Sequence, residues 1–247
     1  MKRWRLFVCW DIHWYKIWTW DAEKLSKEVW YQARRLSKDD VLVILWDFWH
    51  LWYTLGTNKE QEYNLDLLAD LNYTIAVVPW NHENYNEIFW LPEIEKWWAR
   101  VWELKRETGS IYFLKRWEVY NINWRKILAI WGALSIDRTW RIEEKTWWML
   151  EYLTEKEKET AIENVKKHKK FDYILTHTCP QSLISYFLWY EDCSAKMTDD
   201  VAIFLEYIWK ELKLGFKQWH FWHLHKDKCT DDKKFCCHYK GVPIELD

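Results

Sequence analysis

The stretch Val41-Leu42-Val43-Ile44-Leu45 is a continuous apolar run that leads directly into Trp46 and Asp47. Such a run is typical of a strand that is buried on both faces, as in a parallel sheet. Similar runs lie at 5–9 and 73–78, and the apolar residues of the segments between the runs have helical spacing. This alternation of strands and helices predicts an α/β protein.

The rest of the sequence continues the alternation. We expect helices at 22–36, 58–71, 93–106, 154–169 and 199–213, strands at 117–122, 125–131, 171–176 and 216–221, and a closing hairpin at 234–246. Thr154 and Glu157 have the spacing of a capping box, which marks the start of the fourth helix. Because the sequence has no linker, repeat or low-complexity segment, we expect a single domain over residues 1–247.

The composition narrows the possible partners and the compartment. The 36 basic and 38 acidic side chains give a net charge of −2, which provides no electrostatic reason to expect a nucleic-acid partner. No uncharged apolar run approaches the ~18–20 residues that span a bilayer, so we expect no membrane partner. The N-terminal residues make a poor signal peptide, and six cysteines without regular spacing are typical of reduced thiols. The chain is therefore expected to be cytoplasmic.

Side chains that can bind a metal follow five of the predicted strands. They are Asp11, His13, Asp47, Asn81, His177, His223 and His225. In open α/β sheets, functional sites lie just beyond the carboxyl ends of strands, and residues i and i+2 of an extended segment point the same way. A mixed set of oxygen and nitrogen ligands suits Mn, Fe or Zn, and a shared carboxylate would allow a centre of two metals.

These residues lie in five short motifs. In order, the motifs are Trp10-Asp11-Ile12-His13-Trp14, Trp46-Asp47-Phe48-Trp49-His50, Trp80-Asn81-His82-Glu83, Thr176-His177 and Trp222-His223-Leu224-His225. The series resembles that of the calcineurin-like metallophosphoesterases, G-D-x-H-G, G-D-x-x-D/H, G-N-H-E/D, a later His and G-H-x-H. The resemblance implies a sandwich of two central mixed β-sheets flanked by helices.

The resemblance also implies a phosphoester hydrolase that uses two divalent metal ions, with Mn²⁺ expected first and Fe or Zn as alternatives. Position by position, Asp11, His13 and His225 would bind one ion, Asn81, His177 and His223 would bind the other, and Asp47 would bridge them. His82 would be the general acid for the leaving group, a role that suits an imidazole because its pKa lies near neutral pH. The expected substrate is a phosphoprotein or a small phosphomonoester.

Two arginines are candidates for binding the substrate. Arg138 and Arg141 follow the segment 132–137 and could hold a phosphate through forked hydrogen bonds, although a solvated or ion-paired arginine is equally expected there. Glu83 is expected to support the metal centre rather than to bind an ion. His50 and Leu51 stand where the phosphoprotein phosphatases have an Asp-Arg pair, so the orienting carboxylate and the arginine of that branch are in question.

Three alternatives stay open at this point. The chain could be a catalytically inactive relative that acts as a binding or interaction protein. It could be a nucleotide or nucleic-acid phosphodiesterase, or a module that stacks bases or sugars on exposed tryptophans.

Tryptophan occupies every glycine position of the motifs. The chain has 24 Trp and 5 Gly, whereas average usage near ~7% would give about 17 glycines. Asn123-Trp124 also stands between two predicted strands, where a two-residue turn would call for Asn-Gly. Our hypothesis is that UGA encodes glycine in the source organism and has been translated as tryptophan, which predicts UGA codons for Trp10, Trp46, Trp80 and Trp222. The opposing interpretation is a tryptophan-rich core.

One more group of residues could bind a metal. Cys229, Cys236, Cys237 and His238 could form a zinc site. Adjacent cysteines of a strand point to opposite faces, however, so we expect ordinary packing there.

Overall fold

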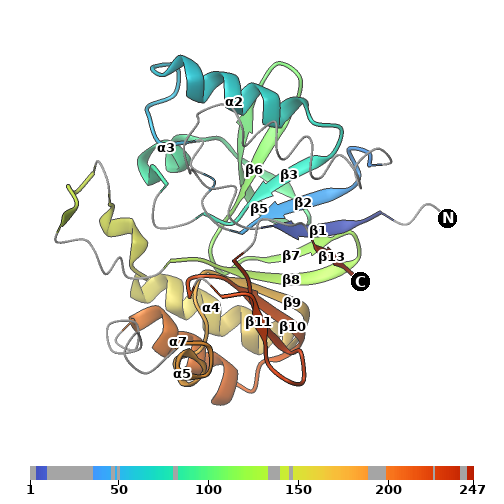
Figure 1. Cartoon of the computed structure of the whole chain (residues 1–247), viewed down its shortest axis with the longest axis vertical. Coiled ribbons are helices and arrows are strands. Elements are labelled where there is room, and N and C mark those ends of the chain that lie inside the picture. Colours follow the sequence, from blue (N-terminus) through green and yellow to red (C-terminus); the bar gives the residue numbers. More distant parts are fainter. Residues whose placement is uncertain are drawn as a thin grey trace.

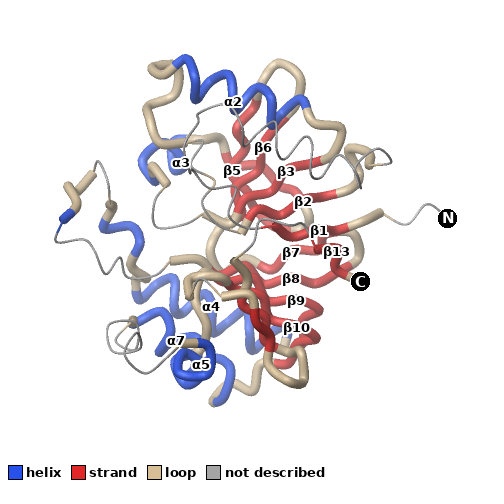
Figure 2. Tube along the Cα trace, in the orientation of Figure 1, coloured by secondary structure: helices blue, strands red, loops and turns tan. Residues whose placement is uncertain are grey.

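The structure is a computed structural model that describes residues 4–9, 36–45, 48, 51–79, 83–132, 140–144, 147–188, 199–224, 226–239 and 244–247. The described chain forms two mixed β-sheets that pack against each other, with helices on their outer sides (Figure 1). Figure 2 shows the strands stacked through the middle of the molecule and the helices at its two ends. The α/β class with two mixed sheets, predicted from the sequence, is confirmed.

The first sheet has seven strands in the order β13-β1-β2-β3-β6-β5-β4. Their bounds are β1 Leu6–Cys9, β2 Val41–Ile44, β3 Thr74–Val77, β4 Glu93–Lys96, β5 Ala99–Lys105, β6 Ser110–Leu114 and β13 Ile244–Leu246. Strands β1, β2, β3 and β6 are parallel, and every residue of β1 and β2 is buried. This burial explains the unbroken apolar runs in the sequence.

The second sheet has six strands in the order β11-β12-β10-β9-β8-β7. Their bounds are β7 Val119–Ile122, β8 Arg125–Ile130, β9 Lys170–Thr176, β10 Gly215–Phe221, β11 Lys228–Cys229 and β12 Phe235–Cys237. Strands β8, β9, β10 and β12 are parallel. Tyr173 and Leu175 of β9 belong to the same core as the first sheet, whereas Ile174 belongs to the core beneath the helices. The alternation along β9 therefore defines an inner and an outer face of this sheet.

Helices cover the outer sides of the two sheets. Their bounds are α2 Lys59–Asp70, α3 Tyr85–Trp90, α4 Glu155–His168, α5 Gln181–Phe187 and α7 Asp200–Lys210, with a 3₁₀ turn at Met149–Glu151. The predicted capping box of α4 is present, since Thr154 and Glu157 exchange their hydrogen bonds. Within the described part of the chain, no helix is long and apolar enough to cross a membrane.

The helix predicted at 93–106 is wrong. This segment is the antiparallel hairpin of β4 and β5, whose turn is Trp97-Trp98 with φ angles of 54° and 70°. Positive φ at both central residues defines the type I′ turn, which normally selects Asn or Gly. Because two tryptophans stand where Asn or Gly would mark a turn, the sequence gives no sign of the hairpin. The charged residues around them therefore suggested a continuous helix.

Tryptophan recurs at positive φ elsewhere. Of the nine described non-glycine residues with positive φ, four are Trp97, Trp98, Trp117 and Trp124. A bulky residue with positive φ is a genuine outlier, whereas glycine populates this region freely. Asn123 and Trp124 have φ angles of 50° and 69°, as the predicted two-residue turn requires. These backbone angles support the glycine hypothesis without using any family motif.

The closing hairpin predicted at 234–246 is also wrong. Strand β12 pairs with β10 and β11 in the second sheet, whereas β13 pairs with β1 in the first. The C-terminal segment therefore passes from one sheet to the other. A pairing between residues this far apart in the sequence has no local signal.

The cysteines differ in part from the reduced state that we expected. Cys229 and Cys236 form a disulfide across β11 and β12. Cys9, Cys179 and Cys237 are free and buried, and burial raises the pKa of Cys237 to about 12. Such a thiol is held in its neutral form and is a poor nucleophile.

Candidate metal centre

His177 and His223 lie at the carboxyl ends of two neighbouring parallel strands. His177 directly follows β9, and His223 is the second residue after β10. The backbone N–H groups of Trp222 and His223 donate to the carbonyl of His177 at 3.2 and 3.1 Å, and the N–H of His177 donates to the carbonyl of Ile130 at 3.3 Å. The backbone thus fixes both histidines at one edge of the second sheet.

The two imidazoles face each other. Nε2 of His177 lies 2.8 Å from Nδ1 of His223, and the ring centroids are 4.5 Å apart. Two nitrogens bound to one ion at about 2.1 Å lie about 3.0–3.4 Å apart. A shift of a few tenths of an ångström would therefore let both nitrogens bind one ion. The resemblance assigned these two histidines to the same ion.

Two hydrogen bonds hold the end of β9 in place. The indole Nε1 of Trp219 donates to Oγ1 of Thr176 at 2.7 Å, and this hydroxyl donates to the carbonyl of Thr178 at 2.5 Å. His177 is fully buried beside these groups, whereas His223 is half-buried. The pair is therefore buried at His177 and partly exposed at His223.

Trp222 occupies the space next to the pair. Its ring packs edge-on against His177, with the centroids 5.4 Å apart and the planes at 77°, and it is fully buried. This position is one of the motif glycines of the resemblance. Glycine at 222 would leave open the volume that the indole now fills.

The segments that follow β2 and β3 lie side by side. The backbone N–H of Asn84 donates to the carbonyl of Leu51 at 3.0 Å, and its side-chain amide donates to the carbonyl of Trp52 at 3.0 Å. Glu83, next to Asn84, is fully buried. These bonds join the segments that directly follow the Asp47 and Asn81-His82 motifs. Glu83 therefore lies in the interior, where a residue that supports the metal centre is expected. Its supporting role stays a prediction.

The other predicted site residues are only partly described. Asp11, His13, Asp47, Asn81, His82, His225 and Arg138 lie outside the described residues. Arg141 is half-buried in the described segment 140–144, and its binding of a phosphate stays a prediction. The structure thus brings together one pair of the predicted ligands, His177 and His223.

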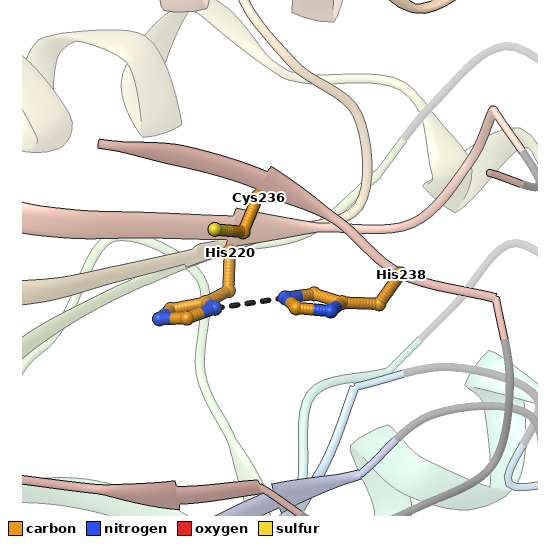
Figure 3. Close-up of side chains that lie close together, drawn as sticks. All are labelled: His220, Cys236 and His238. Atoms are coloured by element: carbon orange, nitrogen blue, oxygen red, sulfur yellow. Dashed lines mark hydrogen bonds between the residues drawn. The ribbon is translucent and has the colours of Figure 1, made fainter. Parts of the chain in front are cut away.

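A second histidine pair was not predicted. Nδ1 of His220 lies 2.9 Å from Nε2 of His238, and one potential ligand atom from each of His220, Cys236 and His238 lies within 4.8 Å of the others (Figure 3). Burial, together with the neighbouring His238, lowers the pKa of His220 well below its usual value, and burial lowers the pKa of His238 to about 3. Both rings are therefore neutral. Cys236 and His238 have i, i+2 spacing along a strand, and this signal could have shown that they share a face.

Comparisons with models of protein families, with curated proteins and with solved structures found no match.

Proposed function

We propose that the chain is a metal-dependent phosphoesterase with a calcineurin-like fold. The observation that carries the proposal is the contact of 2.8 Å between His177 and His223 at the ends of adjacent parallel strands. These two residues are 46 positions apart in the sequence, and the resemblance assigned them to one ion. The two mixed sheets flanked by helices are consistent with the same fold.

The chemistry follows from the donor set. His177, His223 and Asn81 would hold one divalent ion, Asp11, His13 and His225 would hold a second, and Asp47 would lie between them. Bound divalent ions, Mn²⁺ first, would supply an activated water and neutralise charge on the phosphoryl oxygens.

The remaining residues would act on the substrate, a phosphoprotein or a small phosphomonoester. His82 would give its proton to the oxygen of the leaving group, since an imidazole titrates near neutral pH. Arg138 and Arg141 would bind the phosphate oxygens through forked hydrogen bonds.

The contact of Trp222 with His177 favours a second candidate function, that of an inactive relative. If the tryptophans are genuine, a buried indole fills the space beside the candidate ligands, and the chain would be an inactive relative that binds a partner. A chain with glycine at every motif position, residues 10, 14, 46, 80 and 222, distinguishes the two functions. We expect that version to hydrolyse phosphoesters faster than the chain as written.

The test is hydrolysis of an aryl phosphate with Mn²⁺ by the chain with glycine at the motif positions, into which the variants below are introduced. We expect His223→Gln to lose at least about a hundredfold in turnover and to bind less metal, because it removes an ion ligand. His82→Ala should retain its metal and lose about a hundredfold or more, because only the general acid is removed. His168→Gln is the matched control, since His168 ends α4 on the outer side of the second sheet. Full activity of His223→Gln would contradict the proposal.

A further inference from the structure

His220, Cys236 and His238 form a cluster on the inner face of the second sheet. His220 of β10 is in register with Cys236 of β12, and His238 follows Cys236 by two positions. The relative exposures of the three residues are 3%, 4% and 6%. The ring of His220 lies 5.9 Å from that of Tyr173, an inner-face residue of β9. Cys237, which follows Cys236, instead belongs to the core under the helices.

The distances within this cluster fit a tetrahedral ion. The two histidine nitrogens are 2.9 Å apart, and the sulfur of Cys236 completes a group whose ligand atoms all lie within 4.8 Å of one another. Ligands at the usual zinc distances are about 3.3 Å apart for two nitrogens and about 3.6 Å apart for nitrogen and sulfur. Figure 3 shows the rings with nitrogens facing each other and the sulfur above them. Small side-chain shifts would open the space for one ion.

The protonation of the two rings also suits a metal ion. Both imidazoles are neutral because of their burial, and neutral imidazole is the form that binds metals.

The disulfide controls whether the sulfur is available. Cys236 is bonded to Cys229, which lies on the exposed strand β11. A dithiol reductant that reaches Cys229 would give up two electrons and two protons and become a disulfide, while Cys229 and Cys236 become two thiols. Binding of an ion would then release the thiol proton of Cys236 to solvent.

We propose that reduction of the Cys229–Cys236 disulfide creates a zinc site whose ligands are His220, Cys236 and His238. Cys229 is the nearest candidate for a fourth ligand, which would complete the Cys₂His₂ set of structural zinc sites. The site is separate from the proposed phosphoesterase centre, which has no sulfur ligand. It would let the redox state of one disulfide determine whether this edge of the sheet is held by a covalent bond or by an ion.

The test uses Co²⁺ as a spectroscopic substitute for zinc in the full chain. A phosphine that becomes its oxide reduces the disulfide, and thiol counting verifies the reduction. We expect reduced protein to show a sulfur-to-cobalt charge-transfer band, which the oxidised protein lacks and which one equivalent of Zn²⁺ abolishes. Ions at the phosphoesterase centre give no such band, so the two proposals fail independently.

Two variants complete the test. Cys236→Ser should lose the band, whereas Cys237→Ser should keep it, because Cys237 points to the opposite face of the same strand. Because the oxidised and reduced forms of the unmodified chain are compared first, the result does not depend on the folding of a variant. Absence of the band in verified reduced protein, or its full retention in folded Cys236→Ser, would overturn the proposal.

Discussion

Trp98 is the second central residue of the turn between β4 and β5, with φ at 70° and 81% of its surface exposed. The left-handed backbone costs a residue with a Cβ atom about 1–2 kcal/mol. A side chain this exposed recovers little of that cost by burial. Trp124 repeats the situation with φ at 69° and 77% exposure. Glycine fits both positions better than tryptophan does.

Substitution of Trp98 by glycine tests this argument. We expect Trp98→Gly to raise the free energy of unfolding by about 1 kcal/mol, because it removes the strain of positive φ. The matched control is Trp90→Gly, since Trp90 is 87% exposed but lies in α3. Glycine in a helix lowers stability by up to about 1 kcal/mol. Urea denaturation measures both changes, and equal losses in the two variants would contradict the argument.

At the scale of elements, the predictions succeeded where the sequence carries a local signal. Strand β2 is a continuous apolar run, β9 contains the apolar run 173–175, and α4 begins at a capping box. The β4–β5 hairpin was mistaken for a helix because tryptophans occupy its turn, and β6 was missed altogether. Strand β13 pairs with β1 through a contact between the two ends of the chain, and no local pattern encodes such a contact.

The start of β2 depends on one buried carboxylate. Asp40 accepts hydrogen bonds from the backbone N–H groups of Arg5 and Ser37 at 2.7 and 2.8 Å, which join the turn before β2 to the start of β1. Burial raises the pKa of Asp40, but these bonds and the charge of Arg5 outweigh that effect, so its pKa is lowered. A lowered pKa in the folded state stabilises the protein above the unfolded pKa, near 4, and this contribution is lost as the pH falls through the folded pKa.

Asparagine at position 40 would therefore weaken this junction. We expect Asp40→Asn to lower the free energy of unfolding by about 1.5–3 kcal/mol at pH 7, the range for hydrogen bonds to a charged group. The loss should shrink below about pH 4, where the wild-type carboxyl also becomes neutral. Asp39→Asn is the control, because Asp39 is exposed next to it. Denaturant unfolding at both pH values gives the comparison, and identical behaviour of the two variants would refute the assignment.

At the scale of the whole molecule, contacts between the two sheets and between the ends of strands determine which residues lie together in the candidate site. The side chain of Asn123, in the turn between β7 and β8, donates to the carbonyls of Arg5 and Asp39 at 2.8 and 3.1 Å and so joins the second sheet to the first. The family resemblance implied that His177 and His223 share an ion, and the structure places them in contact. The His220–His238 pair escaped prediction because it depends on the register of β10 with β12.

The central claim is that residues 11, 13, 47, 81, 177, 223 and 225 surround two metal ions. The most direct measurement is anomalous X-ray scattering from crystals of the protein loaded with Mn²⁺. We expect two manganese peaks about 3.5–4 Å apart, one of them bonded to both His177 and His223. Fully loaded crystals with no manganese within bonding distance of these two histidines would contradict it.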